Sequence, residues 1–442
     1  FSSKLKTFSF ILMALGVVGI VAGFLNAPKT IEDVEKLLAD SHHNEASHSE
    51  KVSHDAHAAH AVEATHAEAK VVDSVKVEAV DSTHAVAEAV DSSAVAVAET
   101  HSDNHDSHKK DEVAHSDDEH QKHLEHVLHQ LQNKPWSALY VACIFFMLIS
   151  VGVLAFYAIQ YAAQAGWSPI LFRVMESITG YLLPGSIIFF ILLVAASMHW
   201  GHNHIFVWMN PDVINPKHAD YDKLIDLKSG YLNVPFFLGR AAVFLIVWNL
   251  YRYFSRKNSL AQDAASDNSN YKKNFKLAAG FLVFFIVSES MMSWDWIMSV
   301  DPHWYSTLFG WYVFASFFVS GITVIAMTTL YLKSKGYLEQ VNTSHIHDLA
   351  KFMFGISIFW TYLWFSQFML IWYSNIPEEV TYFVTRIEHY RLPFFGMLAL
   401  NFIFPLLILI NTDFKRLTWI VVMAGTVILF GHYIDFFNMI MP

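Results

Sequence analysis

Residues 136–161 read WSALYVACIFFMLISVGVLAFYAIQY, a continuous apolar run without a charged side chain. A helix that crosses a membrane needs about 20 mostly apolar residues, so this run predicts a membrane-spanning helix. Eight more predominantly apolar runs lie at residues 8–25, 181–200, 234–253, 277–296, 308–332, 349–372, 392–410 and 418–441. Because the runs are continuous and do not alternate, a closed β-barrel is excluded and an all-α polytopic membrane protein with nine spans is predicted.

The negative charge of the chain is concentrated outside these runs. Residues 41–130 hold nineteen acids, six lysines and no arginine, a net charge of −13, whereas the rest of the chain carries +2. A nucleic-acid-binding protein needs a basic patch, so that class is excluded. The single cysteine, Cys143, lies in an apolar run, which excludes disulfides, cysteine-ligated iron–sulfur clusters and thioether-attached haem.

Two segments precede the main group of spans. We interpret residues 1–30 as an N-terminal transmembrane anchor, although a lysine-flanked signal peptide has a similar appearance. Residues 31–135 are an acidic, alanine-rich, low-complexity segment with sixteen of the 25 histidines. This segment cannot bury a core, so we expect disorder, except for a helix at residues 117–131 that leads into the next span. Metal scavenging and pH sensing stay open as functions of its histidines, and a solvated spacer is favoured.

The distribution of Lys and Arg between the spans predicts the orientation. One side of the membrane collects fourteen of these residues and the other side five. The side richer in Lys and Arg is normally cytoplasmic. We therefore expect a multi-pass protein with a cytoplasmic N-terminus, an extracytoplasmic histidine-rich segment and residue 442 outside.

Ionisable and strongly polar residues inside a membrane are costly and mark functional sites by default. In the predicted orientation they gather in the outer half of the spans and in the outer loops. They are His199, Arg240, Glu289, Asp295, Asp301, His303, Gln367, His432 and Asp435.

Metal and haem sites are disfavoured by the positions of the histidines. Haem b needs two axial histidines at membrane depth, and only His432 lies well inside a span, with His199 at an edge. His199, His202 and His204 have a spacing that could bind zinc, but no fixed fourth ligand is evident. We therefore predict no metal site.

Two positions are candidates for proton transfer. His432 and Asp435 lie three residues apart on one helix face, so the carboxylate can orient the imidazole. The pair could instead hold the helices together. Glu289 could carry a proton or could pair with Arg240 on the preceding span, and the sequence leaves both alternatives open.

The most specific string is SWDWIMSVDPHW, from Ser293 to Trp304. Its tryptophans are typical of an aromatic belt at a membrane surface, but a belt does not explain its two aspartates and one histidine. Quinol oxidation requires groups that accept two protons, and a carboxylate near an imidazole meets this need.

Together with the layout of the spans, this string resembles the membrane subunits of the polysulfide-reductase (NrfD-like) type, in particular those of alternative complex III, a bacterial quinol:cytochrome c oxidoreductase. The match continues through STLFGWY at residues 306–312, and the resemblance covers about residues 136–442. It implies one four-helix bundle at 136–296 and a second at 297–442, with a tenth helix beyond Pro442.

The resemblance also implies partners and a location. Such complexes contain two related membrane subunits, one that oxidises menaquinol and a companion that provides proton passage or support. The long histidine-rich insertion favours the companion. We expect a bacterial inner membrane, the sister subunit, an iron–sulfur protein, multihaem and monohaem cytochrome c subunits, and a terminal cytochrome oxidase as a further partner.

By the same resemblance, a quinone site would involve Asp295, Asp301 and His303, with Trp294 packing on the ring and His199 and Glu289 nearby. Menaquinone is the expected cofactor, with none bound covalently. The candidate proton-transfer residues are Glu289, Asp295, Asp301, His303, His432 and Asp435. Three functions stay open: an anchoring and proton-conducting subunit, direct menaquinol oxidation, and, because two four-helix halves suggest repeats, a secondary transporter.

Overall fold

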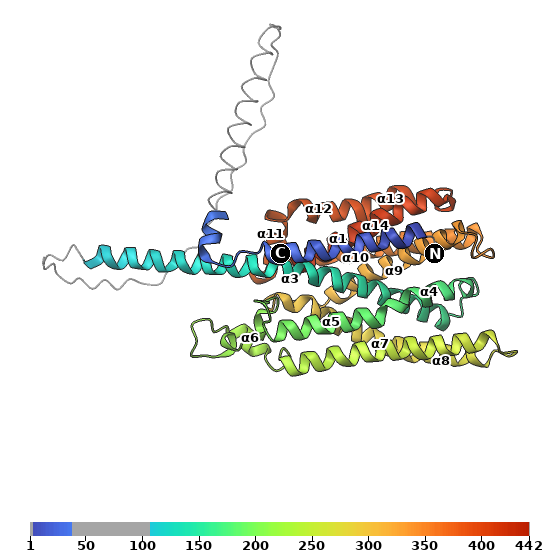
Figure 1. Cartoon of the computed structure of the whole chain (residues 1–442), viewed down its shortest axis with the longest axis horizontal. Coiled ribbons are helices and arrows are strands. Elements are labelled where there is room, and N and C mark those ends of the chain that lie inside the picture. Colours follow the sequence, from blue (N-terminus) through green and yellow to red (C-terminus); the bar gives the residue numbers. More distant parts are fainter. Residues whose placement is uncertain (1–2, 38–106, 442) are drawn as a thin grey trace, which may run out of the picture. The chain divides into compact units, whose positions relative to one another are not determined.

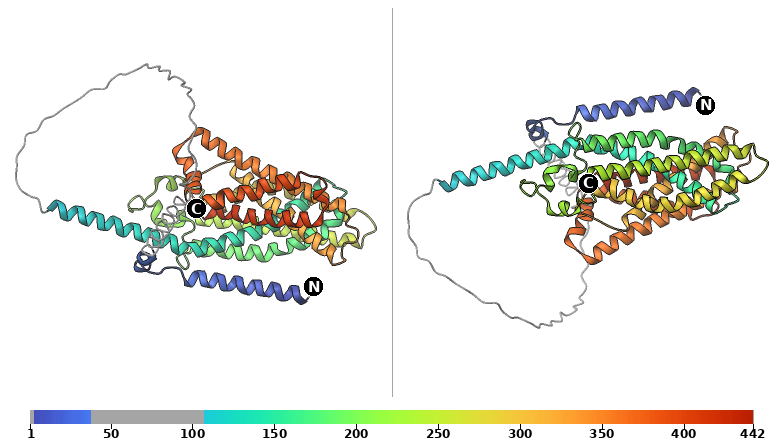
Figure 2. Two further views of the ribbon diagram at one scale, coloured as in Figure 1. Left: turned by 90° about the horizontal axis from the view of Figure 1, so that it is seen from above. Right: turned by 90° about the horizontal axis from the view of Figure 1, so that it is seen from below.

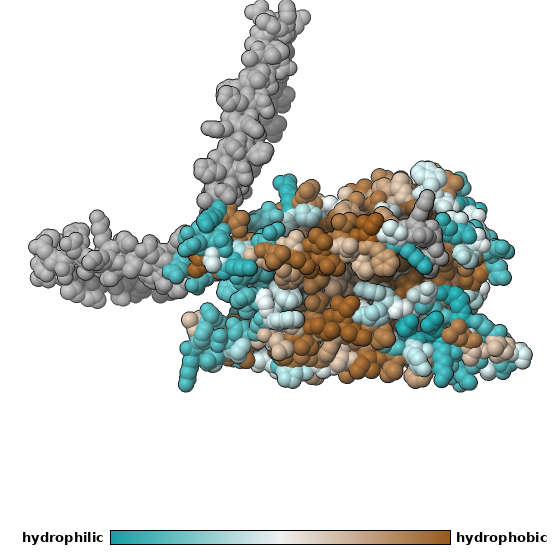
Figure 3. Space-filling model, viewed as in Figure 1, coloured by the Kyte–Doolittle hydropathy of each residue, from teal (hydrophilic) through white to brown (hydrophobic). Residues whose placement is uncertain are grey.

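The computed structural model describes residues 3–37 and 107–441 of the chain. Within these ranges it contains helices and no strands, and nine helical segments are long and apolar enough to cross a membrane. They are Lys6–Leu25, Val127–Ala162, Pro169–Ser197, Val234–Asp263, Ser269–Val300, Phe309–Ser334, Thr343–Ser374, Arg391–Leu409 and Thr418–Ile440. The prediction of an all-α polytopic membrane protein with nine spans is confirmed. Figure 3 shows a hydrophobic band across these helices, with hydrophilic residues at both ends.

The chain divides into two compact units. The first comprises Phe1–Ala27 and Leu131–Pro442, and the second is Pro28–Gln130. In the second unit, residues 31–37 are helical and helix α3 (Ser107–Ala162) begins, so the helix predicted at 117–131 is present. Residues 38–106, which make up most of the predicted low-complexity segment, lie outside the described residues.

The first group of four spanning helices consists of α3, α5 (Leu182–Ser197), α7 (Val234–Asp263) and α8 (Ser269–Trp296) (Figure 1). Helix α4 (Phe172–Ile178) leads into α5, and α7 packs against both α5 and α8. Tyr140 joins α3 to the group, because its ring contacts Phe189 and its hydroxyl donates to the backbone oxygen of Trp296 over 2.9 Å.

The second group consists of α9 (Phe309–Ser334), α10 (Thr343–Ser374), α12 (Arg391–Leu398) with α13 (Phe404–Leu409), and α14 (Thr418–Ile440). A π-helical turn, Ala399–Ile403, joins α12 to α13 within one span. Helix α9 packs against α10 and α14, and α12 packs against α14. The spanning helices run roughly parallel in the two views of Figure 2. Eight of the nine described spanning segments, all except Lys6–Leu25, thus form two groups of four.

Helices α3 and α9 form the centre of this arrangement. In each of them 78% of the most apolar window is buried, against 50% or less in the other spans. A Cβ atom on Gly152 would lie 2.5 Å from the backbone oxygen of Phe317, and one on Gly321 would lie 2.8 Å from the backbone nitrogen of Val153. The two backbones therefore touch, which only glycine permits here.

We expect Gly152→Ala to destabilise the protein, because the added methyl group forces the two central helices apart. Overpacking of this kind costs about 1–3 kcal/mol. Thermal unfolding of the purified protein in detergent measures the loss. Gly355→Ala on α10 is the control, since nothing lies within 4 Å of the added atom. Equal unfolding temperatures for the two variants would contradict the close contact.

The two ends of the helices differ in composition and are called the basic end and the tryptophan end. The basic end carries Arg252 and Arg256 of α7 and the lysines at the start of α8. The tryptophan end carries the connection between α5 and α7, which includes α6 (Lys223–Lys228), together with the turn after α8 and helix α11 (Pro377–Glu388). Which end faces the cytoplasm stays a prediction.

Candidate functional site

Four acidic side chains are buried among the described spanning segments: Glu176, Glu289, Asp295 and Asp435. Charged groups in this environment need partners or a proton, so their surroundings indicate what each can do. Glu176 was not predicted from the sequence. It follows Arg173 by one helical turn, pairs with it over 2.6 Å and accepts from the hydroxyl of Tyr157 over 2.9 Å. The sequence does carry a signal for Glu176, because it is the lone acid inside the apolar stretch 174–197.

Asp435 lies at the centre of a fully buried polar cluster, which we call the Asp435 cluster: Asp435, His432, Tyr312, Ser316 and Trp360. The carboxylate accepts hydrogen bonds from the Tyr312 hydroxyl, from Ser316 Oγ over 2.7 Å and from Trp360 Nε1 over 2.9 Å. The contributors lie on α9, α10 and α14. Helical spacing brings His432 beside Asp435 and Tyr312 beside Ser316.

His432 joins the cluster through Ser316. Its Nδ1 atom lies 2.9 Å from Ser316 Oγ and 3.5 Å from the nearer oxygen of Asp435. A hydroxyl has one proton, so Ser316 donates to one of these partners and accepts from the other. The short contact to Asp435 assigns the donation to the carboxylate and the acceptance to the His432 N–H. Imidazole, hydroxyl and carboxylate therefore form a continuous hydrogen-bonded chain.

The π-helical turn brings the amide of Asn401 close to the histidine. Asn401 Nδ2 lies 3.5 Å from His432 Nδ1, and a Cβ on Gly431 would lie 2.1 Å from Asn401 Oδ1. Gly431 thus makes room for Asn401. Asn401 Oδ1 and His432 Nε2 are buried without a hydrogen-bond partner among the described residues. Turns of this type are frequent at functional sites, and an imidazole nitrogen without a protein partner can exchange a proton.

Arg386 of α11 closes the cluster at the tryptophan end. Its guanidinium donates to the backbone oxygens of Asn438 and Tyr382 over 2.7 and 2.8 Å and lies 3.3 Å from the centre of the Tyr382 ring. Burial lowers the pKa of Arg386 and raises that of Tyr382. A cavity of about 10 Å³ lies between Tyr312 and Arg386, enough for about one water molecule.

Asp295 is neutralised by Arg240. The guanidinium of Arg240 contacts both carboxylate oxygens, with Nε at 2.7 Å and Nη2 at 3.0 Å. The rings of Tyr231 and Phe236 lie about 4 Å from the guanidinium carbon. Arg240 therefore pairs with Asp295, so the pairing of Arg240 with Glu289, one of the two alternatives from the sequence, is not the one observed.

Within the described ranges, the carboxyl group of Glu289 has only hydroxyl partners. It accepts from Ser293 Oγ over 3.2 Å and from Ser290 Oγ over 3.3 Å, and it is 4% exposed. No cation lies within 4.0 Å of it among the described residues. An ionised carboxylate in this place would be an uncompensated buried charge, which is costly. Glu289 is suited to hold a proton.

The residues expected at a quinone site are divided between three places. Trp294 and Asp301 line a pocket of about 360 Å³ at the tryptophan end, together with Trp304, Lys228 and Tyr231. Asp295 lies beside this pocket, against Tyr231, in its pair with Arg240. His303 contacts Asp222 over 2.5 Å, and His199 stacks on His204 with ring centres 5.0 Å apart. No hydrogen bond or ion pair between described residues joins His199 to the pocket.

No family model matches this chain, and no curated protein matches it either. Among the described residues, no group of three His, Cys, Asp or Glu side chains could hold a metal ion. The chemistry available inside the spans is that of carboxyl, imidazole and hydroxyl groups in hydrogen-bond contact, which can accept and pass protons.

Asp222 at the tryptophan end permits a prediction about pH. It caps α6, accepting from the backbone N–H groups of Leu224 and Ile225 over 2.8 and 3.2 Å. Burial acts to raise its pKa, but the contact with His303 and these two hydrogen bonds outweigh burial and lower it below 3.8. The cap therefore contributes fully above about pH 4 and is lost as the pH falls through the lowered pKa.

Asp222→Ala should remove about 1 kcal/mol of local stability at neutral pH. Hydrogen exchange of the Leu224 and Ile225 amides measures this loss, which should shrink toward pH 3. Asp220→Ala is the control, because the Asp220 side chain is 69% exposed and forms an ion pair with His218 at the surface. Unchanged protection of α6 in Asp222→Ala at pH 7 would contradict the capping role.

Proposed function

We propose that this chain is an integral membrane subunit of a quinol:cytochrome c oxidoreductase of the alternative complex III kind. In this role it anchors peripheral redox subunits at the tryptophan end and conducts protons through its spanning helices. The string from Ser293 to Trp304 and the two groups of four helices support the assignment. The proposed assembly includes the sister membrane subunit, an iron–sulfur protein and cytochrome c subunits in a bacterial inner membrane.

One observation carries the proton role: the last helix of each group holds a buried acid whose hydrogen-bond donors are neutral. Glu289 of α8 accepts from two serine hydroxyls, and Asp435 of α14 accepts from a tyrosine, a serine and a tryptophan. An acid that only held helices together would be better stabilised by a cation, as Asp295 is by Arg240. Neutral donors leave the acid able to gain and lose a proton.

The test is Glu289→Gln in the intact complex, reconstituted in liposomes. Glutamine keeps the shape and one of the two acceptor oxygens but cannot take up a proton, so proton release per electron should fall at least ten-fold. Glu339→Gln, an exposed acid between α9 and α10, is the matched control. Unchanged proton release in Glu289→Gln would remove the proton role of Glu289 and leave the anchoring role.

A second candidate function is direct menaquinol oxidation in this chain. The pocket at the tryptophan end supports it, because its volume and aromatic lining suit a small apolar ligand and Asp301 and Lys228 supply polar contacts. A photoreactive quinone analogue should then label peptides covering residues 294–305. Labelling confined to the sister subunit would reject this function and leave the first proposal intact.

A further inference from the structure

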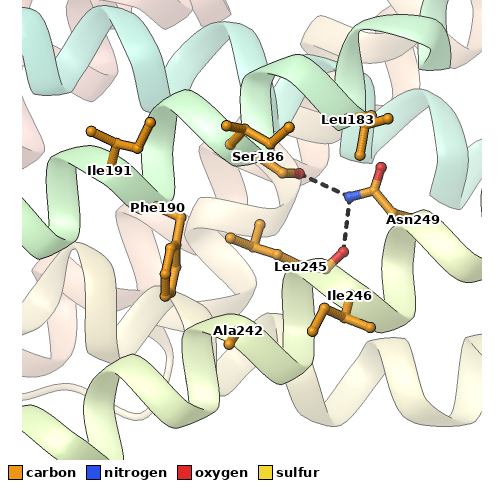
Figure 4. A pocket seen from close by; sticks show the side chains of 9 residues that line it. Leu183, Ser186, Phe190, Ile191, Ala242, Leu245, Ile246 and Asn249 are labelled. Carbon is orange, nitrogen blue, oxygen red and sulfur yellow. Dashed lines mark hydrogen bonds between the residues drawn. The ribbon is translucent and has the colours of Figure 1, made fainter.

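A lipid-facing groove runs between α5 and α7 (Figure 4). Its volume is about 300 Å³ and its lining is almost entirely apolar, with Leu183, Ile187 and Phe190 from α5 and Ala242 and Ile246 from α7. Leu183, Ile187 and Ile246 are 50–57% exposed. The α7 side extends over about 10 Å from Ala242 to Asn249. The groove therefore has the shape and polarity to hold a hydrocarbon chain.

The groove becomes polar toward the basic end. Asn249 Nδ2 donates to Ser186 Oγ over 3.0 Å and to the Leu245 backbone oxygen over 2.8 Å, as the dashed lines in Figure 4 show. Asn249 Oδ1 is buried and has no partner among the described residues. The amide of Asn249 therefore marks the point at which the apolar lining gives way to polar groups.

Arg252 lies one helical turn beyond Asn249. Its Nη2 atom is 3.6 Å from the position that a Cβ on Gly180 would take, so the guanidinium lies beside the start of α5. Its Nε atom is buried and has no hydrogen-bond partner among the residues that the structure describes. In the described part of the chain, no carboxylate lies within 4.0 Å of Arg252 or of Arg256, one turn further on.

The neighbouring arginine shows the contrast. Arg173, also at the basic end, pairs with both Glu176 and Asp263. Its charge is paired inside the protein, whereas those of Arg252 and Arg256 have no carboxylate partner in the described part of the chain. Two uncompensated guanidinium groups at the end of an apolar groove complement a phosphate attached to an acyl chain.

We infer that the groove between α5 and α7 is a binding site for an anionic phospholipid. One acyl chain lies in the groove past Asn249, and the phosphate contacts Arg252. Phosphatidylglycerol has this chemistry. A zwitterionic lipid would bring a positive group next to the two arginines, and an apolar helix would leave them without a counter-charge.

The test uses the full-length protein, delipidated in detergent and titrated with phosphatidylglycerol or phosphatidylcholine. Native mass spectrometry reports the bound lipid. Phosphatidylglycerol should bind more tightly, and Arg252→Gln should weaken it about five-fold, the effect of one basic residue near a lipid surface. Lys273→Gln, which removes an exposed charge at the start of α8, is the control.

A second variant tests the acyl chain separately from the headgroup. Ile246→Trp fills the groove and should displace both lipids, although all charges are retained. Equal binding of the two lipids by the unmodified protein would overturn the inference. The same conclusion would follow if Arg252→Gln bound phosphatidylglycerol as tightly as Lys273→Gln does.

Discussion

Asp435→Asn is expected to reduce proton release at least ten-fold in the reconstituted complex. Asparagine has nearly the shape of aspartate, but it does not take up the proton that a carboxylate accepts. Its amide would also place a donor opposite Tyr312, which donates to Oδ1, or opposite Ser316 and Trp360, which both donate to Oδ2. The hydrogen-bonded chain from His432 through Ser316 would then end at a group that cannot be protonated.

The measurement is the change of pH inside liposomes that contain the complex, followed during quinol turnover. Asp413→Asn is the control, because it removes an exposed carboxylate next to the start of α14. Thermal unfolding separates a transport defect from misfolding, since one mismatched hydrogen bond should cost about 1–3 kcal/mol. Proton release at the level of the control, in a folded variant, would show that Asp435 is structural.

The second large effect is expected on stability. Arg240→Leu leaves the fully buried carboxylate of Asp295 without its counter-charge, and such a loss costs about 3–5 kcal/mol. Thermal unfolding in detergent should show a large decrease. Arg391→Leu, an exposed arginine at the tryptophan end, should change stability by no more than about 0.5 kcal/mol.

The double variant Arg240→Leu with Asp295→Leu tests the reason for this loss. If the cost comes from an unpaired buried charge, removing both partners should restore most of the stability. A double variant as unstable as Arg240→Leu alone would mean that Arg240 acts mainly through its stacking on Tyr231 and Phe236. A loss no larger than that of Arg391→Leu would contradict the pairing itself.

The fold was largely predictable, because continuous apolar runs have one solution in a membrane. The ends of the helices were not. Helix α7 continues ten residues beyond the predicted end at residue 253, and α8 begins eight residues before its predicted start at 277. Hydropathy detects only the part of a helix that lies in hydrocarbon, whereas backbone hydrogen bonds continue the helix into water.

The candidate site was predictable only where its residues lie on one helix. Spacing alone places His432 beside Asp435. The other members of the Asp435 cluster come from two other helices: Tyr312 and Ser316 from α9, and Trp360 from α10. Their contacts with Asp435 therefore depend on how the helices pack. Packing also decides the partner of Asp295.

The loop after α8 shows the same limit. The string around His303 suggested a carboxylate nearby in sequence, yet the histidine contacts Asp222, which is 81 residues away. Long-range pairing of this kind depends on where a loop folds back, and neither periodicity nor composition encodes it.

We propose that this chain works inside a quinol:cytochrome c oxidoreductase. The most direct measurement is affinity purification of the full chain from its native membrane in mild detergent, followed by a visible spectrum and identification of the subunits. We expect a c-type haem spectrum, an iron–sulfur protein and a second membrane subunit of the same type. A colourless protein that purifies alone would contradict it.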